Sequence, residues 1–464
     1  MLGGVPTGHP GADVRAAGET DVYADRARRL GLPFAPVVHL GQAGPADIAA
    51  IRHGTFAIAA DGDHLAYFAP EETMLPLVGR WLRKFPEMRN RLRVATPAAI
   101  RAALVRSAAA HLADDAVDRL AARHRQHSAR VVVTSPQAIG ALLLCLLAAA
   151  GIYFDTIGTL VAIDLIGGML FFRVSALRFV AAGFVDRRPL AAAAPTVSER
   201  DLPVYTILLP LYGEANVVAD LIASVGALDW PQDRLDVKLL IEADDRATIA
   251  AAERAIPGPP FEIVIVPPLG PRTKPKALAF ALPLARGDFI TVYDAEDRPH
   301  PQQLRQAYAT FARSGPDLAC LQSALVIDNG DDNWLTLLFA IEYAALFDGL
   351  LPALAALGMP LPLGGTSNHF RRIVLEKVGG WDPFNVTEDA DIGFRLARFG
   401  YRSATIDLPT MEDAPISIGP WFRQRSRWFK GWMQTWWSTH AIRNGWFANS
   451  DSSARSASDS SARA

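Results

Sequence analysis

The sequence predicts an α/β protein in which two globular parts are separated by a pair of apolar helices, and three observations lead to this prediction. Strand-like and helix-like segments alternate from residue 203 onward, which is typical of a mainly parallel sheet covered by helices. Two apolar runs, at 131–154 and 156–172, are each near the length that crosses a bilayer. A shorter α/β pattern precedes them, and 464 residues suffice for two or three domains.

Composition narrows the class of protein. Half of the residues are hydrophobic, a fifth are charged, and the formal net charge is −2, so no nucleic-acid-binding surface is indicated. The two cysteines, Cys145 and Cys320, are too few for a disulfide framework and fit a reducing compartment. Residues 1–19 lack the basic start and apolar core of a signal peptide, so we expect a flexible, cytoplasmic N-terminus.

Residues 20–127 are expected to form a small α/β module. A helix at 25–31 ends at a glycine, and strands at 55–59 and 64–68 flank a turn of hairpin type. Helical patterns follow at 75–85 and 97–122. The module contains no cluster of catalytic type, so its charged residues are interpreted as solvated surface.

The two apolar runs carry basic residues at both outer ends and none in the turn between them. This bias predicts a membrane hairpin over 131–178 with both ends cytoplasmic, the alternative being a buried helical hairpin. Asp164 would then face a partner helix rather than lipid. A third apolar run, 334–357, contains Glu342, Asp348 and Pro352, and is therefore expected to be a buried or surface-lying helix.

A linker at 189–202 leads into the larger α/β domain at 203–440. Apolar β-rich runs lie at 204–211, 237–241, 261–266, 288–293 and 318–326, with helical stretches at 215–228, 247–255, 275–285 and 301–313. In such sheets ligands bind beyond the carboxyl ends of the strands. The chemistry of this domain is therefore expected where the strands end.

Two of the predicted strands end in acidic residues. Asp244 and Asp245 follow the second strand, and Asp294, Glu296 and Asp297 follow the fourth. Hard oxygen ligands in this arrangement suit Mg²⁺ or Mn²⁺ held jointly with a diphosphate. Such a metal neutralises charge on a departing nucleotide as a Lewis acid.

Two further motifs lie in the last third of the chain. Thr387, Glu388 and Asp389 open an amphipathic helix, where capping by Thr387 alone is the alternative interpretation. An aromatic and basic helix at 421–437 contains the sequence Gln424-Arg425-Ser426-Arg427-Trp428. By itself this helix would be interpreted as an amphipathic segment lying at a membrane surface.

These acidic clusters, T-E-D and Q-x-x-R-W together resemble family 2 glycosyltransferases of the cellulose-synthase and hyaluronan-synthase type. The resemblance implies the nucleotide-sugar-binding GT-A fold. It also implies an inverting, membrane-anchored transferase that moves sugar from a UDP-sugar to a growing polysaccharide at the bacterial inner membrane. In that arrangement both the N-terminal module and the catalytic domain are cytoplasmic.

The resemblance also implies roles for individual residues. Asp389 would be the general base, with Glu388 beside it, because a sugar hydroxyl needs a carboxylate to accept its proton. Glu296 stands where the family's D-x-D motif has its second Asp, which makes Asp297 a third candidate metal ligand with Asp294. The other implied contacts are, on the donor side, Asp244, Asp245, Lys274, Lys276, Asp294, Gln424, Arg427 and Trp428, and on the acceptor side, Gly365, Thr366, Ser367 and Trp428.

The N-terminal module resembles the N-terminal domain of type II secretion ATPases, through Arg29-Leu30-Gly31-Leu32-Pro33-Phe34 and the turn at 93–96. Some relatives of that domain bind cyclic di-GMP. The resemblance implies a docking module for a secretion or regulatory partner, and it leaves the binding of a ligand open.

Three functional hypotheses remain. No long apolar run follows Trp437, and the Ser/Ala/Asp/Arg tail at 449–464 is expected to be disordered, so either the natural protein is shorter than polymerising relatives or this sequence is truncated. A processive synthase, a non-processive transferase acting on a lipid or short acceptor, and an inactive scaffold are all compatible with this end. The sequence does not name the sugar.

Overall fold

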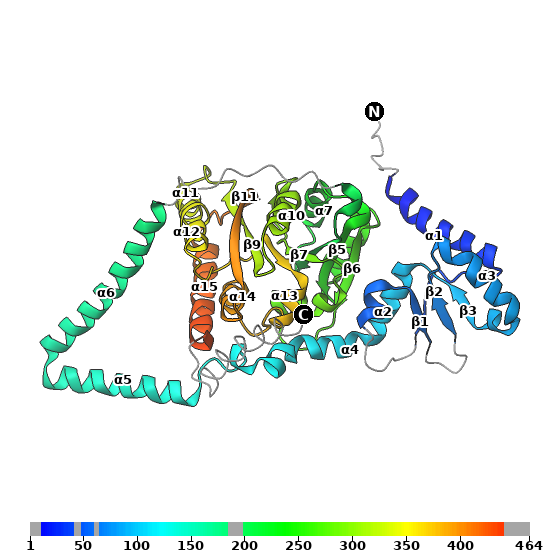
Figure 1. Cartoon of the computed structure of the whole chain (residues 1–464). Coiled ribbons are helices and arrows are strands. Elements are labelled where there is room, and N and C mark those ends of the chain that lie inside the picture. Colours follow the sequence, from blue (N-terminus) through cyan, green and yellow to red (C-terminus); the bar gives the residue numbers. More distant parts are fainter. Residues whose placement is uncertain (1–10, 41–47, 60–64, 184–197, 440–464) are drawn as a thin grey trace, which may run out of the picture.

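The computed structural model describes residues 11–40, 48–59, 65–183 and 198–439. A small N-terminal module lies at one side of a larger α/β domain, and two long helices project as an arm on the opposite side (Figure 1). The predicted turn at 60–63, most of the linker at 189–202 and the tail at 449–464 lie outside the described residues.

The N-terminal module combines a three-stranded sheet with four helices. Its sheet has the order β1-β2-β3, antiparallel and then parallel, which includes the predicted hairpin. Gly31, with φ of 64°, ends the first helix, and the Thr96 hydroxyl accepts from the Ala99 N–H at the start of the last one. The elements are α1 (Gly11–Leu30), α2 (Ile48–His53), β1 (Phe56–Ile58), β2 (Ala66–Phe68), α3 (Leu75–Lys84), β3 (Leu92–Val94) and α4 (Pro97–Arg123).

The first helix corrects the expected boundary of the module. Residues 11–19, expected to be flexible, belong to α1, which therefore starts 14 residues before the predicted helix at 25. The physical reason is that no proline interrupts 11–30, and nine of its twenty residues are alanine or arginine, which favour helix and outweigh Gly18.

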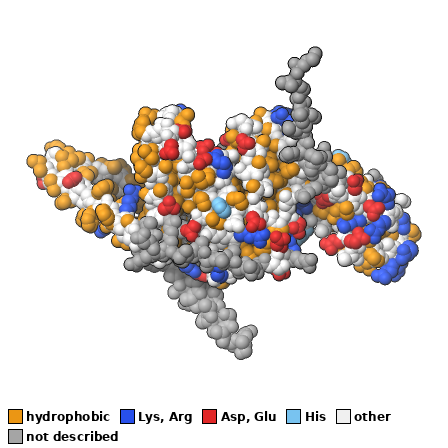
Figure 2. Space-filling model, turned by 90° about the horizontal axis from the view of Figure 1, so that it is seen from above, with side chains coloured by type: hydrophobic (Ala, Val, Ile, Leu, Met, Phe, Trp, Pro, Cys, Tyr) orange, Lys and Arg blue, Asp and Glu red, His pale blue; other side chains and the backbone are white. Residues whose placement is uncertain are grey.

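The arm consists of α5 (Ser135–Phe154) and α6 (Thr156–Ala182), joined at Asp155. The Asp155 carboxylate accepts from the Gly158 N–H at 3.0 Å and so caps α6. Hydrophobic side chains cover the arm (Figure 2), and Asp164 is exposed on it. By length and composition α5, α6 and the helical segment Trp334–Ala356 are each long and apolar enough to cross a membrane.

The larger domain is built on an eight-stranded sheet of order β6-β5-β4-β7-β10-β9-β11-β8. All five predicted strands are present and run in one direction, but β10 lies between β7 and β9 and is antiparallel to both, so the sheet is mixed. The strands are β4 (Tyr205–Leu211), β5 (Leu235–Glu242), β6 (Phe261–Val266), β7 (Phe289–Val292), β8 (Arg298–Pro299), β9 (Leu318–Ile327), β10 (Asn368–Arg371) and β11 (Arg402–Glu412).

Helices cover both faces of this sheet. One apolar core lies beneath α9, α12 and α13, and the other lies beneath α7, α8 and α10. The four predicted helices are present as α7 (Val218–Gly226), α8 (Arg246–Ala255), α9 (Lys274–Ala281) and α10 (Gln303–Arg313), followed by α13 (Arg372–Lys377) and α14 (Glu388–Arg398).

Two aromatic helical segments lie between the sheet and the arm (Figure 1). The first runs from α11 (Trp334–Tyr343) through a π-helical turn (Ala344–Leu350) into α12 (Leu351–Ala356), and α6 packs against its second half. Its inner side is buried at Phe339 and Phe347, whereas Trp334 is exposed, as expected for a helix lying on the domain surface. The second is α15 (Ile418–Thr439), which contains the predicted aromatic helix.

The N-terminal module contacts the larger domain through α4, which packs against α9. Arg119 of α4 donates to the Ala279 carbonyl of α9 at 3.2 Å. Gly270, with φ of 74°, lies so near α4 that a Cβ there would meet a Val117 methyl at 2.4 Å. The long helix α4 therefore supports the loop that leads into Lys274.

Candidate active site

Four segments far apart in the sequence meet at the end of β7. Lys274 begins α9, Asp294 follows β7, Gly365 precedes β10, and Asp389 lies in the first turn of α14. The Lys274 ammonium contacts Asp294 Oδ1 at 2.5 Å and the Gly365 carbonyl at 2.6 Å. A Cβ built on Gly365 would lie 3.5 Å from Asp389 Oδ2 and 4.0 Å from Asp294 Oδ2. The D-x-D region at 294–296, the T-E-D motif, the basic loop that ends at Lys274 and the predicted acceptor-side loop at Gly365 therefore share one centre.

Lys274 is the cation at this centre. Burial alone would lower its pKa, but Asp294, Glu388 and Asp389 outweigh that effect and raise the pKa above the ordinary value. The lysine therefore stays charged and ties the basic loop to the acidic centre.

The pKa values of both acids in T-E-D, Glu388 and Asp389, are raised above those of ordinary carboxylates. Burial raises the pKa of Glu388 to about 8, with Lys274 opposing and Asp389 adding to the effect. Burial also raises the pKa of Asp389 to about 6, against a hydrogen bond from the Ala390 N–H and the charge of Lys274. A carboxylate with a pKa near 6 is still ionised at neutral pH while being a stronger base than an ordinary aspartate.

The interpretation that Thr387 serves only to cap the helix α14 with its side chain is wrong. Thr387 occupies the N-cap position of α14, but its side chain makes no capping hydrogen bond to that helix. Its hydroxyl instead lies 3.3 Å from the Thr435 hydroxyl of α15, because α15 packs directly on this loop.

Further carboxylates surround Asp294. Burial and neighbouring acids raise the pKa of Glu214, Glu296, Asp297 and Glu412, the last to about 8. Glu412 ends β11, and neither it nor Glu214 was selected from the sequence. The signal for Glu412 was the acidic pair Glu412-Asp413 after a β-like run, which matches the pattern at Asp294.

Asp297 and the loop before β10 are held inside the fold. Asp297 Oδ2 accepts from the Asp294 N–H at 2.5 Å and from the Thr366 hydroxyl, while Asp297 Oδ1 is buried without a partner among the described residues. Thr366 and Ser367 are buried too, and Ser367 holds a left-handed φ of 56°. Of the four predicted acceptor-side residues, Gly365 borders Asp294 and Asp389, whereas Thr366 and Ser367 lie inside the fold and Trp428 lies on α15.

These carboxylates suit a divalent metal in charge and ligand type. Among the residues that the structure describes, no three His, Cys, Asp or Glu side chains are already grouped tightly enough to hold one. Burial, with a further contribution from neighbouring carboxylates, raises the pKa of Glu296 and Asp297, and Asp297 Oδ1 is buried with no donor among the described residues. A cation completed by oxygens of a ligand fits both observations.

The predicted residues at 244–245 have local partners. Asp245 caps α8 by accepting from the Thr248 N–H at 3.1 Å, and it also accepts from the Gly213 N–H at 2.6 Å. Asp244 pairs with Arg272 at 2.6 Å, in the loop that leads to Lys274. Asp244 thus lies beside the loop that ends at Lys274, whereas the Asp245 carboxylate supports the loop after β4.

Lys276 lies away from the acidic centre. Its ammonium group is almost fully buried, pairs with Glu242 at 2.7 Å and donates to the Pro267 carbonyl at 3.0 Å. Lys276 therefore fixes the end of β5, and Lys274 is the basic residue that reaches Asp294.

The Q-x-x-R-W segment lies on α15. Gln424 Oε1 is buried without a hydrogen-bond partner among the described residues, and Arg427 is exposed. Trp428 packs near Phe339 of α11, with the ring centroids 6.1 Å apart. Arg425, which the sequence interpretation passed over, binds both oxygens of Glu342 at 2.6 Å and joins α15 to α11.

Helix α15 packs tightly on the T-E-D loop at Gly431. A Cβ there would meet Thr387 Cγ2 at 2.4 Å and the Thr387 backbone nitrogen at 2.8 Å. The neighbouring Gln434 side chain accepts from the Val386 N–H at 3.1 Å, and Asn385 donates to the Thr435 hydroxyl at 3.0 Å. A glycine inside an aromatic helix was the available sequence signal for this contact.

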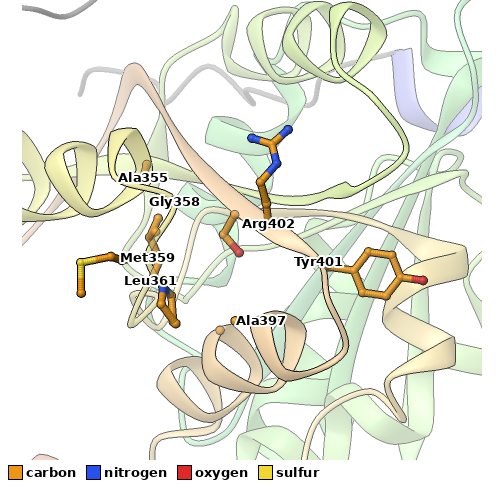
Figure 3. Close-up of a pocket in the computed structure, with 10 residues that line it drawn as sticks. Ala355, Gly358, Met359, Leu361, Ala397, Tyr401 and Arg402 are labelled. Atoms are coloured by element: carbon orange, nitrogen blue, oxygen red, sulfur yellow. The ribbon is translucent and has the colours of Figure 1, made fainter. Parts of the chain in front are cut away.

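A pocket between α12 and α14 does not belong to this centre (Figure 3). It holds about 20 Å³, little more than a water molecule needs, and is lined by residues such as Met359, Ala397 and Tyr401. It contains none of the acidic residues described above.

Comparison with known proteins shows which protein family the sequence around this centre matches. Residues 289–454 match the model of glycosyl transferase family group 2, a range that includes Asp294, T-E-D and Q-x-x-R-W. The chain contains a glycosyltransferase family 2 domain. The predicted α/β fold class is confirmed, and the glycosyltransferase domain carries the acidic motifs at the carboxyl ends of β5, β7 and β11.

Three curated relatives cover about half of the chain. A probable glycosyltransferase, YdaM, of Bacillus subtilis is 26% identical over 50% of this chain and 56% of its own length. A probable glucomannan 4-beta-mannosyltransferase of Oryza sativa is 23% identical over 52% of this chain and 43% of its own length. A beta-monoglucosyldiacylglycerol synthase of Trichormus variabilis is 26% identical over 50% of each chain. The chain thus spans about half the length of the curated relatives that it matches.

Among solved structures, a mannosyltransferase of Pyrobaculum calidifontis in complex with GDP-mannose and Mn²⁺ is similar, with a TM-score of 0.44 and 22% identity. The similarity covers 56% of this chain and 72% of that one. Glucosyl-3-phosphoglycerate synthase of Mycobacterium tuberculosis, in complex with Mn²⁺, UDP and phosphoglyceric acid, gives a TM-score of 0.36 at 16% identity, over 53% and 82% of the two chains.

Proposed function

We propose that this protein is a membrane-anchored, inverting glycosyltransferase that transfers a hexose from a UDP-sugar to a growing polysaccharide. The observation that carries the proposal is the meeting of Lys274, Asp294 and Asp389 around Gly365, since the Cβ position of Gly365 is within 4.0 Å of all three side chains. A base, a cation and a candidate metal ligand next to an open glycine are the groups that sugar transfer needs.

In this proposal Asp389 is the general base. It accepts the proton of the acceptor hydroxyl while that oxygen attacks the anomeric carbon of the donor. The bond from that carbon to the diphosphate oxygen breaks in the same step, so the configuration inverts and UDP leaves. Glu388, whose pKa of about 8 keeps it largely protonated at neutral pH, does not compete for this proton.

The donor side is assigned to Lys274, Asp244 and Arg427. Lys274 offers its ammonium group to phosphate oxygens, and Arg427 offers an exposed guanidinium fork from α15. Asp244, paired with Arg272, is the proposed contact of the uridine, whereas Asp245, Lys276 and Gln424 act through the packing of the surrounding loops. Trp428 stays the proposed aromatic neighbour of the acceptor sugar.

Asp294 and Glu296 are the proposed residues for Mg²⁺ or Mn²⁺, with Asp297 behind them. When bound, the metal would supply Lewis-acid neutralisation of the charge that forms on the leaving diphosphate. Asp297 positions the Asp294 N–H and the Thr366 hydroxyl, and so keeps both ligand-bearing loops together.

A lipid acceptor is the second candidate. It is favoured by the relative whose name specifies a diacylglycerol glycolipid and by the apolar exterior of α5 and α6, which would bring the site near lipid. We further propose that the α5–α6 hairpin anchors the protein in a bacterial inner membrane, with residues 20–127 and 203–440 cytoplasmic. The N-terminal module would then be free to meet a secretion or regulatory partner.

The test is transfer by the full chain in detergent or native membranes, with UDP-glucose, UDP-N-acetylglucosamine and GDP-mannose offered in turn with Mg²⁺ or Mn²⁺. The product is sized and tested for extraction into organic solvent, and Asp389→Asn serves as the blank. A long polymer supports the synthase, and a single sugar on lipid supports the second candidate. Failure of folded protein to release nucleotide from any donor would refute the proposed activity.

A further inference from the structure

A cavity of about 390 Å³ lies where the N-terminal module meets the glycosyltransferase domain. Helices α2 and α4 form one side, and the turn after α9 together with α13 forms the other. This volume is within the range of sites that hold small molecules. The cavity is separate from the acidic centre and shares none of its residues.

One ridge of α4 supplies most of the polar lining. His111, Asp115, Arg119 and Arg123 are four residues apart in series, so they project on the same face of the helix. Arg119 is 8% exposed and is fixed by Asp115, whose Oδ2 lies 2.7 Å from Arg119 Nε. Arg123 is exposed and has no ion-pair partner among the described residues.

Helix α2, on the same side of the cavity as α4, adds a third guanidinium group. Arg52 of α2 donates from Nε to the Pro283 carbonyl at 2.8 Å and pairs with Glu376. Glu376 is shared with Arg372 at 3.3 Å. Three arginines and two carboxylates thus line the cavity, which leaves a surplus of one positive charge with His111 neutral.

We propose that this cavity binds a nucleotide-like molecule that carries phosphate. Guanidinium groups whose orientation is already fixed bind phosphate oxygens with little further loss of freedom, and Arg123 supplies one that forms no ion pair within the described part of the chain. Leu112, Leu282 and Pro283 form an apolar wall that suits the flat face of a base.

The position of the cavity connects it to the donor side of the proposed active site. Leu282 and Pro283 directly follow α9, whose first residue is Lys274. On the same helix α4, Val117 abuts Gly270 in the loop before Lys274. A ligand that moves α4 relative to α9 therefore acts on both ends of this short helix. This regulatory step rests on the proposed function, whereas binding in the cavity does not.

The test is calorimetric titration of the full chain in detergent with GMP and with AMP, in the presence of EDTA so that metal-dependent binding at the donor site is suppressed. Arg123→Ala should weaken binding about tenfold, the effect of losing one charge-assisted hydrogen bond. Arg83→Ala removes an exposed arginine of the same module outside the cavity and should change nothing. Lys274→Ala should also leave this binding unchanged.

Absence of heat with both nucleotides, or equal affinity in the wild type and Arg123→Ala, would overturn the binding site. The regulatory step is measured separately, as a change in the KM for the donor at saturating GMP or AMP that Arg123→Ala loses. Binding without any change in that KM would overturn the regulation and leave the site in place. If no donor is turned over, the titration alone still decides the cavity, so its failure is distinct from failure of the proposed function.

Discussion

The contact between α15 and the T-E-D loop makes Gly431→Ala a sharp test of the site. The added Cβ would lie 2.4 Å from Thr387 Cγ2, 2.6 Å from Thr387 Oγ1 and 2.8 Å from the Thr387 backbone nitrogen. The threonine side chain is buried and hydrogen-bonded to Thr435, and the backbone nitrogen cannot rotate away. The helix or the loop must therefore move.

The substitution has two opposing effects on the free energy of unfolding. Alanine in place of glycine in a helix interior stabilises by about 1 kcal/mol, while overpacking a closed contact costs about 1–3 kcal/mol. We expect a net loss of at most about 2 kcal/mol, a shift of a few degrees in Tm. Activity should fall further, because a displacement of about 1 Å at the reacting groups can reduce the rate about a hundredfold.

Gly419→Ala is the matched control in the same helix. Its added Cβ would meet no atom closer than Arg423 Nη1 at 3.7 Å. The assay compares nucleotide release and thermal unfolding for both variants and the wild type. Equal activity in the two variants would refute the claim that α15 positions Asp389 through Thr387.

Four other predictions follow from the acidic centre and the arm. Asp389→Asn should abolish transfer and leave donor binding, measured by calorimetry, within a few-fold of wild type; loss of donor binding as well would remove the base assignment. Because burial raises the pKa of Asp389 to about 6 and the carboxylate is the active form, kcat/KM should fall below about pH 6, and a profile flat down to pH 5 would contradict this. Chelation of divalent metal should stop turnover, and Glu296→Gln should raise the Mn²⁺ concentration needed for half-maximal activity; full activity in chelator refutes the metal site. With Cys145 replaced by serine, a cysteine at Thr156, beside the turn of the arm, should react with a membrane-impermeant reagent added to intact spheroplasts, and labelling only after lysis would refute the hairpin topology.

Most of the strands that the sequence predicted are buried on both faces; the exception is β6, which lies at the edge of the sheet, is partly exposed, and was predicted from its β-branched residues. Residues of β4, β5 and β9 are almost continuously buried, so each forms an unbroken apolar run. Strand β11 instead is mostly only partly buried, with just Ile406 and Thr410 fully buried, and contains Pro409, while β10 has only four residues. Their place in the sheet depends on pairing with distant strands, which no local pattern encodes.

The site residues likewise fall into those that a local sequence motif predicts and those that depend on contacts between distant parts of the chain. Asp294, Glu388 and Asp389 were recognisable because each stands in a short motif at the end of an element. The sequence could not show which lysine reaches Asp294. Lys274 and Lys276 are two residues apart, and only the direction in which the start of α9 points each side chain brings Lys274 to Asp294 and Lys276 to Glu242. Glu412 reaches the cluster through the register of β11 against β9, which is again a long-range property.

Two packing contacts, one made by α15 and one by α4, reach the loops that carry Asp389 and Lys274. α15 presses on Thr387 at Gly431 and so sets the position of Asp389, while α4 presses on Gly270 and so sets the loop that ends at Lys274. Lys274 and Asp389 are proposed to act on the two partners of the reaction, the donor phosphates and the acceptor hydroxyl. The distance between these two side chains therefore depends on how α15 and α4 pack. Both helices are connected to apolar segments, α4 through residues 124–134 to α5 and α15 through Arg425 to α11. The packing of the apolar helices and the arrangement of the proposed catalytic centre are thus linked through α4 and α15.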